Sequence, residues 1–249
     1  MNMSEDAVTE RSGMEEGQVI MPFYLVCDVS ASMTPDMHAL NDGIRRLRRA
    51  IVGQPQVDDV AQIGIITFSS TAQVVLPLAR MSEEQMPTLQ SQATTDYGGA
   101  FRLLAQTIQQ DVARLKAQRL KVYRPCAYFL TDGLPTDRSW QQTFVSTLTY
   151  DKAAGTGMKG HPLFIPFGFR DASEDVLNKL AYPPDKGKWY HAKTHNIEEA
   201  LTGILTMIMN SVISSGLSVP TGSPTTALPT PSPGSGVLSG PSQYDSQWV

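Results

Sequence analysis

Apolar residues along this chain follow two alternating patterns, short continuous runs and segments with helical spacing. Runs of apolar and β-branched residues predict strands at 23–28, 61–68, 72–78, 126–131, 161–169 and 189–191. Apolar residues spaced three and four apart predict helices at 35–51, 104–115, 140–148, 176–180 and 197–213. Strands that alternate with helices are typical of a doubly wound α/β fold. We therefore expect a mostly parallel six-stranded sheet with helices on both faces.

Two local features refine this prediction of a parallel sheet. Only residues 69–71 separate the second run from the third, which is hairpin spacing and predicts one antiparallel edge strand. Pro162 and Pro166 fall in the fifth run, and each lacks the backbone N–H that a strand ladder uses. We expect that strand to be short, bulged or peripheral.

The first and last predicted helices have simple interpretations. Arginines at 45, 46, 48 and 49 lie largely off the apolar face of the first helix, and a solvated face is favoured over a patch for an acidic partner. The segment 197–213 is apolar but short for a membrane span, and it contains Thr202, Thr206 and Asn210. This pattern predicts a helix that faces the core.

Composition indicates one ordinary globular domain with tails. The chain has 249 residues, of which 41% are hydrophobic and 18% are charged, and its net charge is -4. That charge offers no general attraction for nucleic acid or an anionic membrane. Residues 1–17 are polar and acidic and do not resemble a secretion signal, so we expect a cytoplasmic protein. Cys27 and Cys126 are expected to be two buried thiols without a disulfide.

The ends of the chain differ from its middle. We expect a disordered segment at 1–16, one domain at 17–215, and a flexible tail rich in Ser, Thr, Pro and Gly at 216–249. Three Ser-Pro or Thr-Pro pairs in the tail admit phosphorylation, although a plain linker is favoured. The last residues, 244–249, include Trp248 and are either a docking peptide or a disordered end.

Oxygen-bearing side chains follow two predicted strands and precede a predicted helix. The first apolar run ends in a D-x-S-x-S pattern at Asp28, Ser30 and Ser32, and a later run ends at Asp132. Thr95 offers a further hydroxyl before a helical segment. Ligands bind at the carboxyl ends of strands in such sheets, so these side chains are expected to converge. Carboxylates and hydroxyls suit a hard cation such as Mg²⁺ or Mn²⁺.

This order of motifs, D-x-S-x-S, then T-x-x-G, then an apolar strand ending in T-D-G, resembles the von Willebrand factor A (VWA) domain. The resemblance implies a metal-ion-dependent adhesion site (MIDAS), with hydroxyl ligands from Ser30, Ser32 and Thr95 and carboxylates from Asp28 and Asp132. It further implies a protein partner that completes the metal's coordination with an Asp or Glu side chain. The last helix of the domain is expected to be able to shift when this site is engaged.

A finer resemblance covers residues 17–215. The phrases at 65–68, 129–137 and 167–172 are similar to those of bacterial TerY-like VWA proteins, which are associated with tellurium resistance. That branch implies a cytosolic signalling assembly with Ser/Thr kinases and PP2C-type phosphatases as partners.

Other chemistry has weaker support. Each Asp, Ser or Thr after a strand can simply cap the next helix, and for Asp96 a cap is the preferred interpretation. A Mg²⁺-dependent phosphohydrolase of the haloacid-dehalogenase type also begins with a strand ending in Asp, but it needs D-x-D-x-T, and Ser30 replaces the second Asp. His191 and His195 are predicted to be surface histidines rather than zinc ligands. A non-catalytic binding module is therefore favoured.

Overall fold

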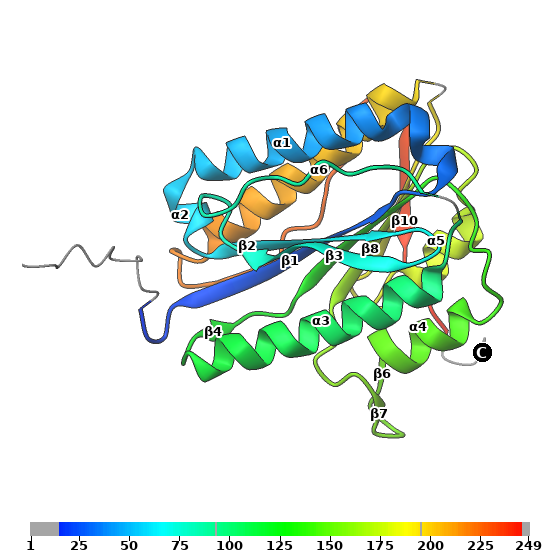
Figure 1. The fold of residues 1–249 in the computed structure, drawn as a ribbon. Helices are drawn as coiled ribbons and strands as arrows, with labels where there is room; N and C mark the ends of the chain where they lie inside the picture. Colours follow the sequence, from blue (N-terminus) through cyan, green and yellow to red (C-terminus); the bar gives the residue numbers. More distant parts are fainter. Residues whose placement is uncertain (1–14, 93, 195, 246–249) are drawn as a thin grey trace, which may run out of the picture.

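The computed structural model describes residues 15–92, 94–194 and 196–245, and it has a central sheet between two groups of helices (Figure 1). The expected α/β class with a mostly parallel sheet is confirmed. Within the described ranges the sheet has eight strands rather than six, and both of its outermost strands are antiparallel to their neighbours.

The strand order places the longest strand, β1, near the middle of the sheet. Across the sheet the strands are β10 (Val237–Pro241), β9 (Lys188–Ala192), β8 (Leu163–Gly168), β5 (Cys126–Thr131), β1 (Val19–Asp28), β2 (Ala61–Phe68) and β3 (Ala72–Ala79). The short β4 (Lys121–Val122) pairs with the start of β1. A separate small hairpin joins β6 (Tyr150–Asp151) to β7 (Thr156–Gly157).

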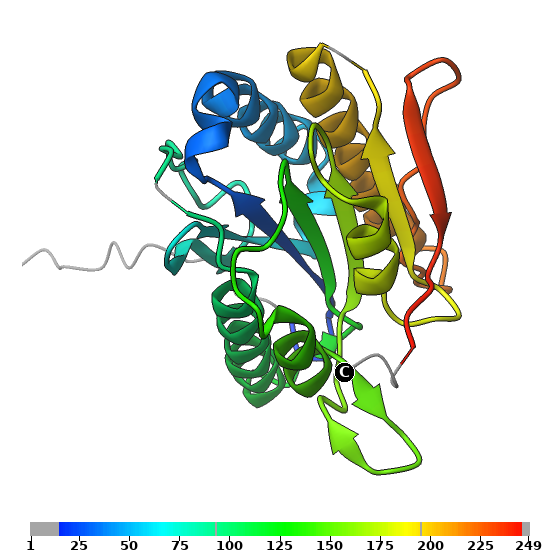
Figure 2. The same cartoon turned by 90° about the vertical axis from the view of Figure 1, so that its right-hand side faces the viewer.

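Helices cover both faces, as Figure 2 shows from the side. They are the 3₁₀ helix η1 (Ala31–Asp36) and the α-helices α1 (Met37–Val52), α2 (Pro55–Asp58), α3 (Tyr97–Ala117), α4 (Trp140–Leu148), α5 (Glu174–Leu180) and α6 (Ile197–Ser218). Residues of α1, α2 and α6 share one apolar cluster with Phe23 and Leu25 of β1. Residues of α3 and α4 share the other cluster with Tyr24 and Val26. Because both faces of β1 are covered, its sequence is a continuous apolar run.

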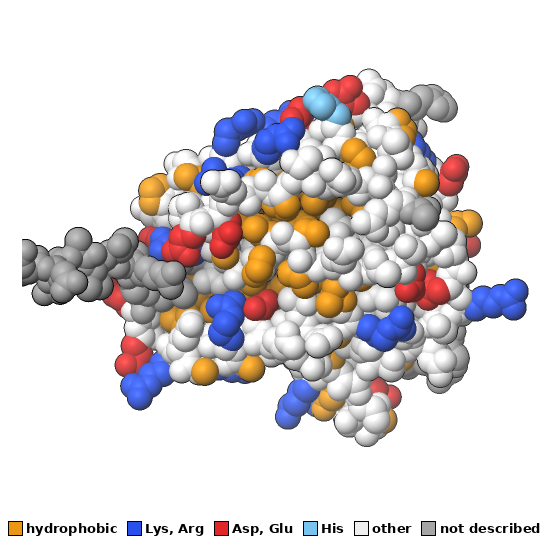
Figure 3. All heavy atoms as spheres, viewed as in Figure 1, with side chains coloured by type: hydrophobic (Ala, Val, Ile, Leu, Met, Phe, Trp, Pro, Cys, Tyr) orange, Lys and Arg blue, Asp and Glu red, His pale blue; other side chains and the backbone are white. Residues whose placement is uncertain are grey.

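The helical spacing of α1 separates its buried and exposed sides as predicted. Leu40, Ile44, Leu47 and Ile51 are buried, whereas Arg46 and Arg49 are exposed. Figure 3 shows Lys and Arg side chains gathered over this helix. The solvated-face interpretation is consistent with this arrangement.

The strand that contains Pro166, β8, lies inside the sheet between β5 and β9 and is six residues long. The sequence predicts a short, bulged or peripheral strand; β8 is short, but it is not peripheral. Its ladder with β9 begins only at Phe167, opposite Tyr190. The missing N–H of Pro166 thus faces no partner strand on that side, which explains how the proline is tolerated.

The segment from residue 216 is arranged differently from the flexible tail that its composition predicts. The helix α6 continues to Ser218, and residues 237–241 pair with β9 as β10. Between these two elements, the Tyr190 hydroxyl donates to the Pro229 carbonyl at 2.6 Å. Tyr244 then packs edge-on against Tyr182, with ring centroids 4.9 Å apart.

The helix α6 is the one helix in the described ranges that is long and apolar enough to cross a membrane by those two criteria. More than half of its apolar window is buried in the protein. Leu201, Ile204 and Ile208 belong to the cluster shared with α1. The prediction of a core-facing helix is confirmed for this structure.

Two predictions about single residues have opposite outcomes. Cys27 and Cys126 are free and buried, as expected. His191, predicted to lie on the surface, is instead 3% exposed, and its Nδ1 lies 3.4 Å from a Glu174 oxygen. The reason is its place in β9, a strand that β8 and β10 flank.

Three predictions concern residues outside the described ranges. The first is the disordered N-terminal segment, of which residues 1–14 are not described. The second is the surface position of His195. The third is the docking peptide that contains Trp248. Residue Glu16 is described, and it forms an ion pair with Arg119 at 3.2 Å.

Candidate metal centre

The carboxyl ends of β1 and β5 bring two carboxylates to one edge of the sheet. These strands are parallel neighbours, with Cys27 opposite Leu130. Asp28 is the last residue of β1, and Asp132 directly follows β5. Both side chains are buried, with residue exposures of 0% and 2%. This edge is where ligands bind in doubly wound sheets.

Hydrogen bonds connect the predicted ligands of the D-x-S-x-S loop to Asp132. The Ser30 N–H donates to Asp28 Oδ1 at 2.9 Å, which folds the loop back over the strand end. The Ser30 and Ser32 hydroxyls lie 3.0 Å apart. The Ser32 hydroxyl then donates to Asp132 Oδ1 at 2.9 Å. Four of the five predicted ligands are thus linked in one local network.

Thr131 closes this network from β5. Its hydroxyl donates to Asp28 Oδ2 at 2.9 Å. The Tyr97 hydroxyl, at the start of α3, donates to Thr131 Oγ1 at 2.8 Å. Tyr97 is held by an edge-on contact with Phe129, with centroids 4.9 Å apart. The aromatic core between the sheet and α3 therefore fixes the orientation of Asp28.

Thr95, the fifth predicted ligand, lies in a loop fastened to the one that follows Asp132. Its carbonyl accepts hydrogen bonds from the Thr136 N–H at 3.0 Å and the Thr136 hydroxyl at 2.6 Å. Thr95 is buried and Thr94 is exposed. The Thr95 hydroxyl makes no hydrogen bond to another residue in the described ranges. The neighbouring Asp96 accepts from the Gly99 N–H at 2.9 Å, so its predicted role as a helix cap is confirmed.

Arg170 brings a positive charge to the same edge. Its guanidinium donates to the Ser32 carbonyl at 2.7 Å and forms an ion pair with Asp36 at 2.5 Å. A guanidinium nitrogen also lies 3.7 Å from Asp132 Oδ2. Arg170 has a left-handed φ of 52°, just after β8. The arginine thus ties η1 and the serine loop to the end of the sheet.

Burial dominates the protonation of the acidic groups. It raises the pKa of Asp28 to about 6, against the lowering effect of hydrogen bonds from Ser30 and Thr131. Burial also raises the pKa of Asp132, and the hydrogen bond from Ser32 and the charge of Arg170 oppose this. Asp36 has its pKa raised by burial, with Arg170 opposing. A cation at this edge would stabilise the ionised form of these carboxylates.

Two carboxylate oxygens at this site accept no hydrogen bond. Asp132 Oδ2 and Asp36 Oδ2 are buried and accept none from any described residue, although guanidinium nitrogens of Arg170 lie 3.7 Å from the first and 2.5 Å from the second. A buried carboxylate oxygen without a hydrogen bond is costly unless a cation or water meets it. The described residues contain no group of three or more His, Cys, Asp and Glu side chains placed to hold a metal. A metal at this edge would therefore need the hydroxyl oxygens together with the two carboxylates, and that set fits a hard divalent cation.

Sequence reasoning missed Arg170 and Asp36 as parts of this centre. A signal for Arg170 existed, because it follows the strand of the 161–169 run and so falls on the ligand-binding edge. Asp36 had no comparable signal, since it lies at the end of η1 with no strand before it.

Comparison with known proteins bears on the same part of the chain. Residues 23–134 match the von Willebrand factor type A domain. This VWA match begins in β1 and ends just after Asp132. VWA domains are commonly protein-interaction or adhesion modules and are generally non-catalytic. No curated protein sequence matches the chain.

Solved structures share the VWA fold at low sequence identity. The pilus adhesin SpaC from Lactobacillus rhamnosus GG, in its open conformation, is 15% identical with a TM-score of 0.56, over 80% of this chain and 31% of its own. Proximal thread matrix protein 1 from the mussel byssus, with a zinc-occupied MIDAS motif, is 14% identical with a TM-score of 0.52. The match covers 80% of this chain and 49% of the mussel protein. A von Willebrand factor type A protein from Catenulispora acidiphila is 13% identical with a TM-score of 0.50. The match covers 78% of this chain and 43% of that protein. The chain thus spans half or less of the length of these proteins.

Proposed function

We propose that this chain is a non-catalytic protein-interaction module that binds an acidic side chain of a partner through a divalent cation. Asp28, Ser30, Ser32, Thr95 and Asp132 would hold the cation, directly or through water. The observation behind the proposal is the partly buried network that joins the two serine hydroxyls to Asp132 and leaves Asp132 Oδ2 without a hydrogen bond. When bound, Mg²⁺ or Mn²⁺ would offer an open coordination position to a carboxylate.

A protein partner is favoured by the surroundings of the site. Leu134, two residues after Asp132, is 55% exposed, the highest value among the exposed large apolar side chains of the described residues. Its loop is fixed, because Thr136 bonds Thr95 and the Asp137 carboxylate accepts from the Tyr97 N–H at 3.0 Å. An exposed apolar side chain on a fixed loop beside a cation site suits docking of another protein's surface.

The alternative, a haloacid-dehalogenase-type phosphohydrolase, is disfavoured by the residue two positions after Asp28. The acid/base position of that class is Ser30, which cannot transfer a proton as a carboxylic acid would.

The metal assignment draws on the donor set and on one relative. The donors are all oxygen atoms, which favours Mg²⁺ or Mn²⁺ over softer ions. The mussel byssus protein, whose fold is similar, has a MIDAS motif that zinc occupies in its structure. We extend divalent binding at this position to the present chain.

The biological setting is proposed from the sequence phrases alone. Similarity at 129–137 and 167–172 to TerY-like proteins favours a cytoplasmic, tellurium-resistance-like assembly. Within it, a Ser/Thr kinase and a PP2C-type phosphatase are the proposed partners.

Affinity capture from native cytosol tests this function. The wild-type chain with Mg²⁺ is compared with the same chain in chelator, with Ser30→Ala, and with Thr94→Ala as a matched control at an exposed neighbouring hydroxyl. The Ser30 N–H that bonds Asp28 survives in Ser30→Ala, so the loop is retained. We expect one partner set that requires Mg²⁺ and Ser30 but not Thr94. Equal retention in all four samples would reject the metal-gated module.

A further inference from the structure

A pocket of about 780 Å³ lies where the parallel strands of the sheet begin, at the opposite end of the strands from the metal centre. Leu163 and Lys188, the first residues of β8 and β9, line it, as does Pro241, the last residue of the antiparallel β10. Parallel strands all begin at one end of the sheet and finish at the other. This pocket and Asp132 are therefore separated by the length of the strands. The pocket is therefore independent of the proposed metal site.

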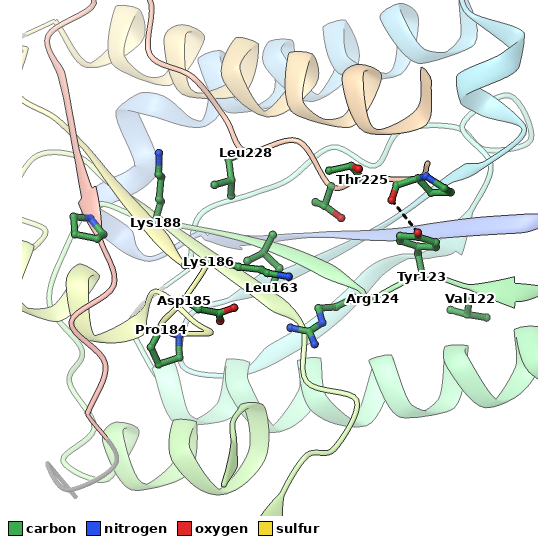
Figure 4. A pocket seen from close by; sticks show the side chains of 14 residues that line it. Val122, Tyr123, Arg124, Leu163, Pro184, Asp185, Lys186, Lys188, Thr225 and Leu228 are labelled. Carbon is green, nitrogen blue, oxygen red and sulfur yellow. Dashed lines mark hydrogen bonds between the residues drawn. The ribbon is translucent and has the colours of Figure 1, made fainter. Parts of the chain in front are cut away.

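The tail segment forms one wall of this pocket, and hydrogen bonds hold it there. The Tyr123 hydroxyl donates to the Pro224 carbonyl at 2.8 Å, a bond drawn in Figure 4. The Ala227 N–H donates to the Ser215 hydroxyl of α6 at 2.8 Å. Leu228 of this segment and Leu163 of β8 give the pocket an apolar lining. The wall is thus built from ordered, bonded residues.

Three basic side chains surround the apolar lining. Arg124 precedes β5, Lys186 precedes β9, and Lys188 is the first residue of β9. In Figure 4 the side chains of Arg124 and Lys186 point toward one another across the pocket. None of the three forms an ion pair with another residue in the described part of the chain.

The charge of the pocket is opposite to that of the protein as a whole. One carboxylate, Asp185, also lines it, so the three cations leave a net charge of +2. The chain itself has a net charge of -4. A local positive concentration in an acidic protein raises the local concentration of anions.

We propose that this pocket binds a small organic anion whose apolar body lies against Leu163 and Leu228 and whose phosphate or carboxylate group meets Arg124, Lys186 and Lys188. The volume falls in the range of about 300–1,000 Å³ that is typical of small-molecule sites. Arginine and lysine form charge-assisted hydrogen bonds with both anionic groups.

A matched pair of fluorescent probes tests the proposal on the full chain. The first probe, 1-anilinonaphthalene-8-sulfonate, has an aromatic body and one anionic group, and N-phenyl-1-naphthylamine is its counterpart without the charge. The test variant is Arg124→Gln/Lys186→Gln/Lys188→Gln, and the control is Arg46→Gln/Arg49→Gln on α1. All five side chains are exposed, so circular dichroism is expected to show unchanged folding.

We expect saturable binding of the anionic probe to the wild type. Its affinity should fall about tenfold or more in the triple variant, because charge-assisted hydrogen bonds are lost, and should change less than about twofold in the control. Binding of the neutral probe should be the same in all three proteins. Competition by octyl phosphate and by octanoate then distinguishes the two anionic groups, with octanol as the neutral comparison. Equal binding by the triple variant and wild type, no saturable binding, or equal competition by octanol would overturn the proposal.

Discussion

The Ser32 hydroxyl donates a hydrogen bond to Asp132 Oδ1 at 2.9 Å, across 100 positions of sequence. This bond fixes the serine loop after β1 to the end of β5. Both groups are proposed metal ligands, and hydrogen bonding within the protein itself brings their oxygen atoms together. A preorganised site loses less conformational entropy when its ligand binds.

Replacing Ser32 with Ala should therefore weaken metal binding more than it affects folding. We expect Mn²⁺ affinity to fall about tenfold or more, because a ligand is lost. The free energy of unfolding should fall by only about 1 kcal/mol, which is typical of one hydrogen bond. Calorimetric Mn²⁺ titration and urea unfolding measure the two effects. Thr34→Ala is the control, since that hydroxyl is in the same turn but bonds the Ala31 carbonyl; similar losses in both variants would contradict the assignment.

Metal binding should weaken in mild acid. The pKa of Asp28 is raised to about 6, so below that pH its carboxyl holds a proton that a cation must displace. Affinity for Mn²⁺ should fall about tenfold per pH unit below about pH 6 and change little above it. The same raised pKa means that the ionised carboxylate destabilises the metal-free fold, and this cost begins to fall at about pH 6 and is gone near the ordinary pKa of 3.8. The gain in thermal stability from added metal should therefore shrink between about pH 7 and pH 5, and a constant gain would count against this account.

The ion pair of Arg170 with Asp36 should show energetic coupling. Arg170→Met leaves the buried Asp36 carboxylate without its cation and should destabilise the protein by about 2 kcal/mol or more. Adding Asp36→Asn should recover part of that loss, because only the Asp132 carboxylate is then left without the charge of Arg170. Urea unfolding of the two single variants and the double variant gives the coupling energy. Strictly additive losses would show that the two groups do not interact in solution.

The backbone amides of β10 should exchange slowly with solvent. Residues 237–241 pair with β9, although the composition of the tail predicts flexibility. Hydrogen exchange measured by mass spectrometry should show protection at Leu238 and Gly240 relative to the exposed turn at 221–222. Equally fast exchange in both segments would restore the flexible-tail interpretation.

Much of the sheet could be predicted because its central strands are buried on both faces. The runs at 61–68 and 126–131 match β2 and β5, and the polar residues that end such runs mark the ligand-binding edge. This is why the amino-acid sequence alone is enough to pair Asp28 with Asp132.

The remaining features depend on tertiary context. The strand β10 has Ser, Gly and Pro among its five residues, so no local propensity marks it, and only pairing with β9 makes it a strand. The contact of Arg170 with Asp36 depends on a left-handed backbone turn after β8. The burial of His191 depends on which strands flank β9.

Direct Mn²⁺ titration, followed by electron paramagnetic resonance, is the most direct test of the proposed metal centre. The wild-type chain is compared with Asp132→Ala and Thr95→Ala, and with Thr94→Ala as the exposed neighbour. We predict one Mn²⁺ site in the wild type and in Thr94→Ala, and about tenfold weaker binding or none in the other two variants. Binding that is unchanged in Asp132→Ala, or absent from the wild type, would contradict a metal centre at this edge of the sheet.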